Sequence, residues 1–376
     1  MSRLQPTSPN TLRIWQQNAR KSQIAHEHIL NTADPTKWDI ILIQEPWIDT
    51  YGNSRGNHYF RALYPTPRVP GSNTPFQSFI LINTNIATDA YQQINIPSND
   101  ITAIQLRSEN NYLTIFNIYN DCTHNDSLEA IDRYLDQNRE EVAIARSQMI
   151  WFGDFNRHHP FWEEPCNRHL YQNTRIVEPL LDLISKYGMN MALPEGIPTL
   201  EASTTRNWTR PDNVWCSHAE HNPFITCDVD PSIRPPITDH LPIISIIDMS
   251  IDRSNAKNTR NFREVPWTEF NESLATHLAD IGPPKWLRTK DQFDAATGNL
   301  IRAIQTTIEE TVPISKPNPH QKRWWTRQLT DLKRKRNKLS NEAFRFHDIP
   351  DHPAKAEFRR VSAEYTTLIK QTKKQH

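Results

Sequence analysis

Apolar positions in the first 250 residues form short runs of strand length, separated by amphipathic segments. Residues 38–44 form one continuous run, and residues 11–18 alternate apolar and polar side chains. Further strands are predicted at residues 79–83, 101–106, 112–118, 149–152, 213–216, 224–228 and 241–248. Helices are predicted at residues 21–31, 127–145 and 175–187. Many strands with helices between them predict an α/β layered sandwich.

The remaining residues follow a different pattern. Residues 251–265 are polar and lack periodicity, which predicts a linker, and helices are predicted at residues 267–281 and 291–311. After a proline-broken basic segment, apolar residues recur at three- and four-residue spacing on both sides of a turn, which predicts an antiparallel helical hairpin. The predicted division is a flexible N-terminus (1–10), an α/β domain (11–250), the linker (251–265) and a basic helical region (266–376).

The net charge of zero conceals two unlike halves. Residues 1–250 carry a net charge of −9 and residues 251–376 a net charge of +9, so an acidic unit is joined to a basic one. The chain has 8 glycines and neither glycine-rich phosphate-binding motif, so we expect no nucleotide cofactor. No apolar run approaches the ~20 residues of a membrane span, so we expect no membrane partner. Four cysteines without Cys-x-x-Cys spacing indicate reduced, intracellular thiols.

Polar side chains stand at the ends of the predicted strands, where α/β folds place their sites. In chain order they are Asn18, Glu45, Tyr119, Asp154, Asn156, Asp212, Asp239 and His240. Carboxylates that converge in one cleft repel each other unless a cation holds them. Hard oxygen ligands without thiols favour Mg²⁺ or Mn²⁺.

Each of these residues alone has a structural explanation. A capping or buried hydrogen bond would account for Asn18 or Tyr119, and a turn beside Pro211 would account for Asp212. His240 would equally suit a buried core position. Their order along the chain, always at strand ends, favours one shared site.

That order resembles the endonuclease/exonuclease/phosphatase superfamily, the group of AP endonucleases and DNase I. The matching motifs are Gln17-Asn18, Gln44-Glu45, Asn117-Ile118-Tyr119, Gly153-Asp154-Phe155-Asn156, Asp212 and Thr238-Asp239-His240. Within that group, residues 18–22, 44–47 and 154–160 look like the endonuclease domain of LINE-type (non-LTR) retrotransposons. The resemblance covers roughly residues 11–248. The basic tail is similar to the segment that leads into the reverse transcriptase, and no Tyr-x-Asp-Asp polymerase box occurs. We therefore expect a reading frame that ends before its polymerase.

The resemblance implies a four-layered α/β sandwich and metal-dependent cleavage of a phosphodiester. Glu45, supported by Asn18 and with Asp239, would hold Mg²⁺ or Mn²⁺ beside the scissile phosphate. Asp154 would accept the proton of the attacking water, and Asn156 would orient the phosphate.

The same resemblance implies roles for the other candidates. Asp239 would fix the tautomer of His240, which would donate to the phosphate in the transition state. Tyr119 would contact the phosphate and Asp212 would tune the site. Thr199 is a candidate DNA contact, and a plain strand threonine is an equal alternative. Cleavage would leave a 3′-hydroxyl that primes reverse transcription.

The tail over residues 316–376 holds 16 basic and 6 acidic residues. Its candidate DNA-binding residues are Lys322, Arg323, Lys333, Arg334, Lys335 and Arg336. Such runs suit phosphate backbones and nuclear import, and a solvated helix face is the alternative. We expect double-stranded DNA as the target, element RNA as a further partner of the tail, and a nuclear location.

Two other functions remain open. One is an AP endonuclease of DNA repair, against which Arg20 and the basic Trp-Trp tail speak, because many repair relatives carry an acid at the position of Arg20. The other is a decayed remnant that binds nucleic acid without cutting it. An abasic-site assay beside a plasmid-nicking assay separates these possibilities.

Overall fold

The structure is a computed structural model that describes residues 11–69, 74–107, 112–138, 147–171, 174–217, 222–249, 265–283, 286–313 and 324–375, together with residues 251, 253, 260 and 262. The chain divides into two compact units, Met1–Ser254 with Arg323–His376, and Asn255–Lys322. The region predicted to be helical and basic, residues 266–376, is divided between these two units. The last two helices belong to the α/β unit, because their apolar stripe packs against it.

The first sheet of the α/β unit has six strands in the order β13-β14-β1-β2-β4-β3. Its members are β1 (Thr11–Asn18), β2 (Ile40–Gln44), β3 (Phe60–Leu63), β4 (Ser78–Asn83), β13 (Phe224–Val229) and β14 (Ile243–Asp248). β1 is parallel to β2 and antiparallel to β14. The first and last long strands of the unit are thus neighbours.

The second sheet also has six strands, in the order β5-β6-β7-β8-β12-β9. Its members are β5 (Tyr91–Ile94), β6 (Ile101–Arg107), β7 (Tyr112–Tyr119), β8 (Ser147–Asp154), β9 (Met189–Met191) and β12 (Asp212–Ser217). β7 and β8 are parallel, and β12 is antiparallel to β8. A short ribbon of β10 (Leu200–Glu201) and β11 (Trp208–Thr209) stands apart from both sheets. The sequence did not predict β3, β5, β9, β10 or β11, all of which have two to four residues.

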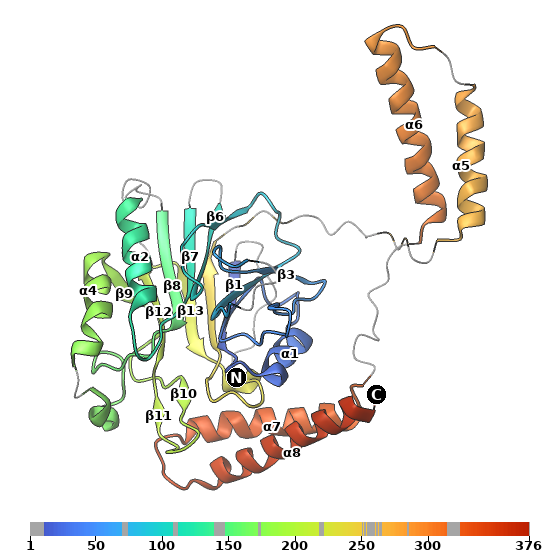
Figure 1. Ribbon diagram of the computed structural model, residues 1–376. Helices are drawn as coiled ribbons and strands as arrows, with labels where there is room; N and C mark the ends of the chain where they lie inside the picture. Colours follow the sequence, from blue (N-terminus) through green and yellow to red (C-terminus); the bar gives the residue numbers. More distant parts are fainter. Residues whose placement is uncertain are drawn as a thin grey trace. The chain divides into compact units, whose positions relative to one another are not determined.

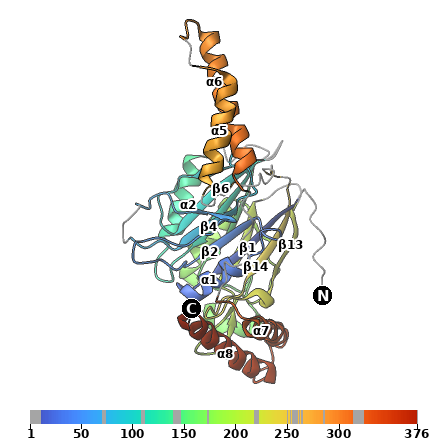
Figure 2. The same cartoon turned by 90° about the vertical axis from the view of Figure 1, so that its right-hand side faces the viewer.

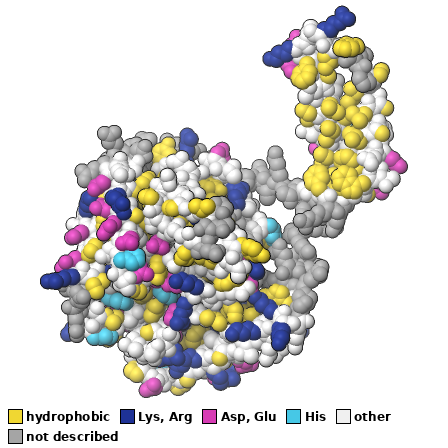
Figure 3. Space-filling model, viewed as in Figure 1, with side chains coloured by type: hydrophobic (Ala, Val, Ile, Leu, Met, Phe, Trp, Pro, Cys, Tyr) yellow, Lys and Arg dark blue, Asp and Glu magenta, His cyan; other side chains and the backbone are white. Residues whose placement is uncertain are grey.

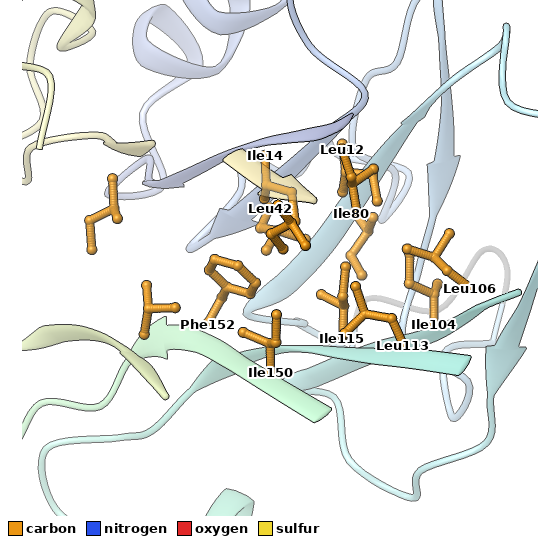
Figure 4. Packing of buried hydrophobic residues seen from close by; sticks show 14 of the residues in the cluster. Leu12, Ile14, Leu42, Ile80, Ile104, Leu106, Leu113, Ile115, Ile150 and Phe152 are labelled. Carbon is orange, nitrogen blue, oxygen red and sulfur yellow. The ribbon is translucent and has the colours of Figure 1, made fainter. Parts of the chain in front are cut away.

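The two sheets pack face to face over a layer of buried aliphatic side chains, as Figure 4 shows. The first sheet contributes Leu12, Ile14, Leu42 and Ile80, and the second contributes Ile104, Leu106, Leu113, Ile115, Ile150 and Phe152. Side chains alternate between the faces of a strand, so Ile40 points into this layer and Ile41 points to the other side.

Helices cover the outer faces of both sheets, as Figures 1 and 2 show. α1 (Gln23–Thr32), capped by Ser22, packs Ala25 and Ile29 against the first sheet. α2 (Asp126–Gln137) and α4 (Glu178–Lys186) pack against the second sheet. The order helix, sheet, sheet, helix confirms the predicted four-layered sandwich. The described residues of the unit also include three short 3-10 helices, η1 (Pro165–Tyr171), η2 (Thr174–Ile176) and η3 (Pro231–Ile233).

Within the second unit, the described residues form α5 (Trp267–Ile281) and α6 (Lys290–Thr311). Both helices were predicted within a residue or two at each end. The side chain of Thr289 caps α6 by accepting a hydrogen bond from the backbone of Gln292.

The predicted C-terminal hairpin is present as α7 (Arg327–Arg345) and α8 (Pro353–Gln375). It lies along the α/β unit beside α1 and the β10–β11 ribbon (Figures 1 and 2). Tyr365 and Ile369 of α8 are buried with Leu329 of α7, and Ile24 of α1 packs against them. Among the described residues, no helix has the length and apolar character that crossing a membrane requires.

Candidate active site

Strand pairing gathers the predicted site residues at one edge of the sandwich. β1 and β2 end side by side at Asn18 and Gln44, and β7 and β8 end side by side at Tyr119 and Asp154. Asp212, the first residue of β12, is paired with Asp154. Both sheets therefore end their strands at the same place, as expected for ligand sites in α/β folds.

Asn18 joins the two sheets at this edge. Its side-chain amide donates to Asp154 Oδ2 at 2.9 Å and to Glu45 Oε1 at 3.3 Å. Asn18 and Asp154 are buried, whereas Glu45 is half-buried. One amide thus fixes two carboxylates that come from different sheets.

Two further motif residues have structural roles. The buried Gln44 side chain donates to the Asn117 side-chain oxygen. The Asn117 amide in turn donates to the carbonyls of Ile43 and Phe79, both at 3.0 Å. These bonds tie β7 to β2 and β4 across the sandwich and thereby set the positions of Glu45 and Tyr119.

The turn after β8 depends on Gly153. A Cβ atom at this position would lie 2.3 Å from the carbonyl oxygen of Ile118, so only glycine fits against β7. Beyond it, Asn156 adopts a positive φ of 50° and its backbone amide donates to Asp154 Oδ1 at 3.1 Å. The Asn156 side chain donates to the Asn120 carbonyl at 2.8 Å. Gly153 and this turn together aim Asp154 at the site edge.

Asp212 is the carboxylate that holds His240. Nδ1 of His240 donates to Asp212 Oδ2 at 2.8 Å, and Thr199 Oγ1 donates to the same oxygen at 2.8 Å. The predicted role of Asp239 in fixing this ring is therefore wrong. Thr199 is fully buried, so the hypothesis that it contacts DNA is also wrong, and its hydroxyl orients Asp212 instead.

Asp239 points elsewhere and pairs with Arg20 Nη1 at 3.2 Å. Adjacent residues of an extended segment face opposite ways, so Asp239 and His240 do not share one side. In this structure Arg20 engages the Asp239 carboxylate. The metal role of Asp239 stays a prediction.

Burial and mutual charge shift the pKa values of the central groups. Burial, reinforced by the Asp212 charge, raises the pKa of Asp154 to about 7. Burial alone would lower the pKa of His240, but the charge and hydrogen bond of Asp212 raise it to about 10. The raised pKa favours the protonated form of His240, whose Nε2 lies 3.9 Å from Asp154 Oδ2. Burial, with the charges of Glu45 and Asp154, raises the pKa of Tyr119, which keeps its hydroxyl a donor.

Two groups of side chains at this edge suit a cation. Asp154, Asp212 and His240 offer ligand atoms within 4.8 Å of one another. The hydrogen bond between His240 and Asp212 already occupies two of those atoms. Glu45 offers a half-buried carboxylate next to the Asn18 amide, and its backbone is held at a φ of 45°. A non-glycine residue in this conformation is uncommon and marks a constrained position.

The candidate DNA-binding residues of the tail divide into three groups. Lys322 and Arg323 lie outside the described residues. Arg334 and Lys335 are exposed on α7, and Lys333 is half-buried there. Figure 3 shows Lys and Arg side chains gathered over α7 and α8.

The prediction that Arg336 binds DNA is wrong. It is 2% exposed and donates to the carbonyls of Arg234 and Pro235 at 2.6 and 3.1 Å. Its guanidinium faces the α/β unit and is withheld from DNA. Arg336 follows Leu332 by four residues and precedes Ala343 by seven, so it lies on the apolar stripe of the helix. That spacing was the signal in the sequence.

Sequence reasoning also missed the polar supports of the site's outer loops. Arg157 is buried and donates to the carbonyls of Asp121 and His124. Glu163 accepts from the backbone of Arg210 at 2.8 Å and pairs with His158. No local pattern marks such contacts, because their partners lie up to 47 positions apart.

Three comparisons place this geometry among known proteins. A family model described as endonuclease-reverse transcriptase matches residues 113–244. No curated protein matches the chain significantly. Many solved structures do match, and three of them cover nearly the same share of the chain.

The first is the endonuclease domain of TRAS1, a telomere-specific non-LTR retrotransposon, with 19% identity over 63% of this chain and 99% of that chain (TM-score 0.49). The second is the AP endonuclease LMAP from Leishmania major, with 10% identity over 64% and 88% (TM-score 0.50). The third is a mannosyl-6-phosphatase from Bacteroides thetaiotaomicron, with 13% identity over 63% and 99% (TM-score 0.43).

The LMAP similarity concerns the fold, and the family model concerns the segment that runs from β7 to β14. That segment carries Tyr119, Asp154, Asp212 and His240. The match of residues 113–244 to the endonuclease-reverse transcriptase model, together with a fold shared with LMAP, agrees with the resemblance predicted from the motifs.

Proposed function

We propose that the chain is a Mg²⁺-dependent DNA endonuclease of a non-LTR retrotransposon, which nicks target DNA and leaves a 3′-hydroxyl to prime reverse transcription. One observation carries the proposal. A protonated His240, held by Asp212, faces Asp154, which shares the Asn18 amide with Glu45. An acid and a base in one buried site suit the hydrolysis of a phosphodiester.

Glu45 and Asn18 are the residues that would hold the metal, because a half-buried carboxylate and an amide oxygen are hard ligands. When bound, Mg²⁺ neutralises the charge of the scissile phosphate and of the leaving 3′ oxygen. Mn²⁺ suits the same ligands.

The remaining roles fall to the chain itself. Asp154 in its ionised form accepts a proton from the attacking water. His240 donates from Nε2 to a phosphate oxygen, while Asp212 accepts from Nδ1 and stabilises the imidazolium. The Tyr119 hydroxyl and the Asn156 amide would orient the phosphate.

Double-stranded DNA is the proposed substrate, and a nuclear location follows from that role. The exposed basic residues Arg334 and Lys335 would contact phosphates of the target. Binding of element RNA by the same tail is a further proposal, with salt-dependent affinity as its signature.

Nicking of supercoiled plasmid tests the function. Wild-type protein with Mg²⁺ should produce open circles with 3′-hydroxyl ends that a polymerase extends. EDTA, Asp154→Ala or His240→Ala should each abolish the reaction. Equal nicking by Asp154→Ala would refute the assignment, and cleavage restricted to an oligonucleotide with an abasic site would favour a repair nuclease. DNA binding without cleavage would identify a non-catalytic remnant.

A further inference from the structure

The C-terminal hairpin reaches the loop that carries His240 through one buried arginine. The Arg336 guanidinium donates to the carbonyls of Arg234 and Pro235 and to Ser362 Oγ of α8. The two carbonyls lie six and five residues before His240. A fork of N–H donors on one guanidinium suits two neighbouring carbonyls better than a single ammonium does.

The loop held in this way has a strained backbone. Ile237 has a φ of 76°, a conformation that a β-branched residue rarely adopts, and its side chain is 44% exposed. Exposure means that little packing of its own compensates this strain. Contacts from the surroundings must therefore keep the loop in place.

Hydrogen bonds connect this loop to the residues at the site edge. Arg234 Nε donates to the Thr238 carbonyl at 3.2 Å and closes the loop on itself. Thr238 Oγ1 donates to the carbonyl of Asn18 at 2.8 Å and accepts from the backbone amide of His240 at 3.2 Å. A displacement of residues 234–237 thus moves both Asn18 and His240.

α8 supplies a second connection through Glu201 of β10. Arg359 Nη1 lies 3.7 Å from the Glu201 carboxylate, which also accepts from Arg234 at 3.1 Å. The backbone amide of Glu201 donates to the carbonyl of Asp239 at 3.0 Å. Both helices of the hairpin therefore contact residues bonded to the Thr238–His240 segment.

The burial of Arg336 is unfavourable by itself. No carboxylate among the described residues pairs with it, and the like charge of Arg234 is close. Burial lowers its pKa to about 9, and its guanidinium lies over the rings of Phe358 and Tyr365 at 5.4 and 5.9 Å. A leucine in the stripe would serve plain packing better, so the two carbonyls account for the arginine.

We propose that Arg336 is a positioning residue for His240, and that the α7–α8 hairpin is an integral part of the nuclease. Arg336 acts by holding residues 234–237 in their strained conformation. The hairpin thereby completes a catalytic unit whose chain is interrupted by residues 255–322. This inference rests on the proposed nuclease function.

The test uses the full chain and single-turnover plasmid nicking. Arg336→Ala should lower the rate of cleavage roughly a hundredfold and leave DNA affinity and Mg²⁺ dependence unchanged, because misplacement by about 1 Å costs that much. Added methylguanidinium should restore part of the rate by filling the vacated site. Arg327→Ala, an exposed arginine of the same helix, is the matched control and should change neither rate nor rescue.

A second pair of variants covers the case in which Arg336→Ala does not fold. Arg336→Lys keeps charge and length but cannot span both carbonyls, and it should lose roughly tenfold in rate. Ile237→Gly relieves the strain and should reduce that loss in the double variant.

The outcomes separate the two proposals. If the wild-type protein does not nick DNA, the proposed function fails first. If the wild-type protein nicks and folded Arg336→Lys or Arg336→Ala does so at the same rate, the positioning role is overturned. Equal losses with and without Ile237→Gly would likewise contradict a role through the loop.

Discussion

Nδ1 of His240 lies 2.8 Å from Oδ2 of Asp212, 28 positions away in the chain, whereas the adjacent Asp239 pairs with Arg20. Asp212 is the first residue of β12, and the register of β12 on β8 places it opposite Asp154. The imidazolium therefore stands between two buried carboxylates that come from neighbouring strands.

This relationship predicts unequal effects of two matched substitutions. Asp212→Asn should reduce the nicking rate by about a hundredfold to ten-thousandfold, because it removes the charge that keeps His240 protonated. Asp239→Asn should lose far less, since a half-exposed ion pair contributes about 1 kcal/mol or less. Single-turnover rates at saturating DNA measure both, and a larger loss for Asp239→Asn would reverse the assignment.

Glu45 is expected to control the metal requirement. Glu45→Gln removes the charge but keeps an oxygen near the Asn18 amide, so the Mg²⁺ concentration for half-maximal nicking should rise by roughly tenfold or more. A titration of the rate with Mg²⁺ measures this shift. Glu27→Gln, on the outer helix α1, should leave the titration curve in place. An unchanged curve for Glu45→Gln would remove Glu45 from the metal site.

Gly153 should be intolerant of any side chain. In Gly153→Ala the Cβ would stand 2.3 Å from the Ile118 carbonyl oxygen, so β7 and β8 must separate. Overpacking of this kind costs about 1–3 kcal/mol, and it also displaces Asp154. Urea unfolding and the nicking rate should both report the change.

Gly298 on α6 provides the matched control for that substitution. A Cβ there meets nothing within 4 Å, so Gly298→Ala should stabilise its helix by about 0.5–1 kcal/mol. Equal effects of the two alanine substitutions would contradict the steric explanation.

Periodicity and strand-end position were sufficient to predict the longer strands of the α/β sandwich and a shared site that includes Asn18, Glu45 and Asp154. Both are short-range properties, because a strand of five to eight residues is recognised from its own side chains, whereas the strands of two to four residues were missed. Short-range patterns could not tell whether Asp212 or Asp239 is the carboxylate that binds the His240 ring. It depends on the register of β12 against β8, which is set by tertiary packing.

The basic residues 333–336 of α7 also show how far sequence patterns can predict the structure. Its four cations look alike in composition, yet Arg336 is buried and Arg334 is exposed. Helical phase distinguishes them, since Arg336 lies in register with Leu329 and Leu332. Phase predicts which residue is buried, but only the structure identifies the surface that buries it.

Asp39 should govern the acid stability of the first sheet. Its fully buried carboxylate pairs with Arg13 at 2.9 Å and with Arg253 at 2.7 Å. Burial alone would raise its pKa, but these two arginines hold it below the ordinary value of 3.8. Asp39→Asn leaves two guanidinium groups without their anion and should lower the free energy of unfolding by about 3 kcal/mol near neutral pH.

The sign of the pH dependence follows from that depressed pKa. The contribution of Asp39 is fully present above the pKa of the unfolded chain and is lost as the pH falls through the lower pKa of the folded state. Urea unfolding should therefore show a constant difference between wild type and Asp39→Asn from neutral pH to about pH 5. The difference should shrink as the pH falls below 3.8, because the wild-type carboxylate then becomes protonated as well. A difference that persists undiminished in acid would mean that packing, and not the ion pairs with Arg13 and Arg253, accounts for the effect of the substitution.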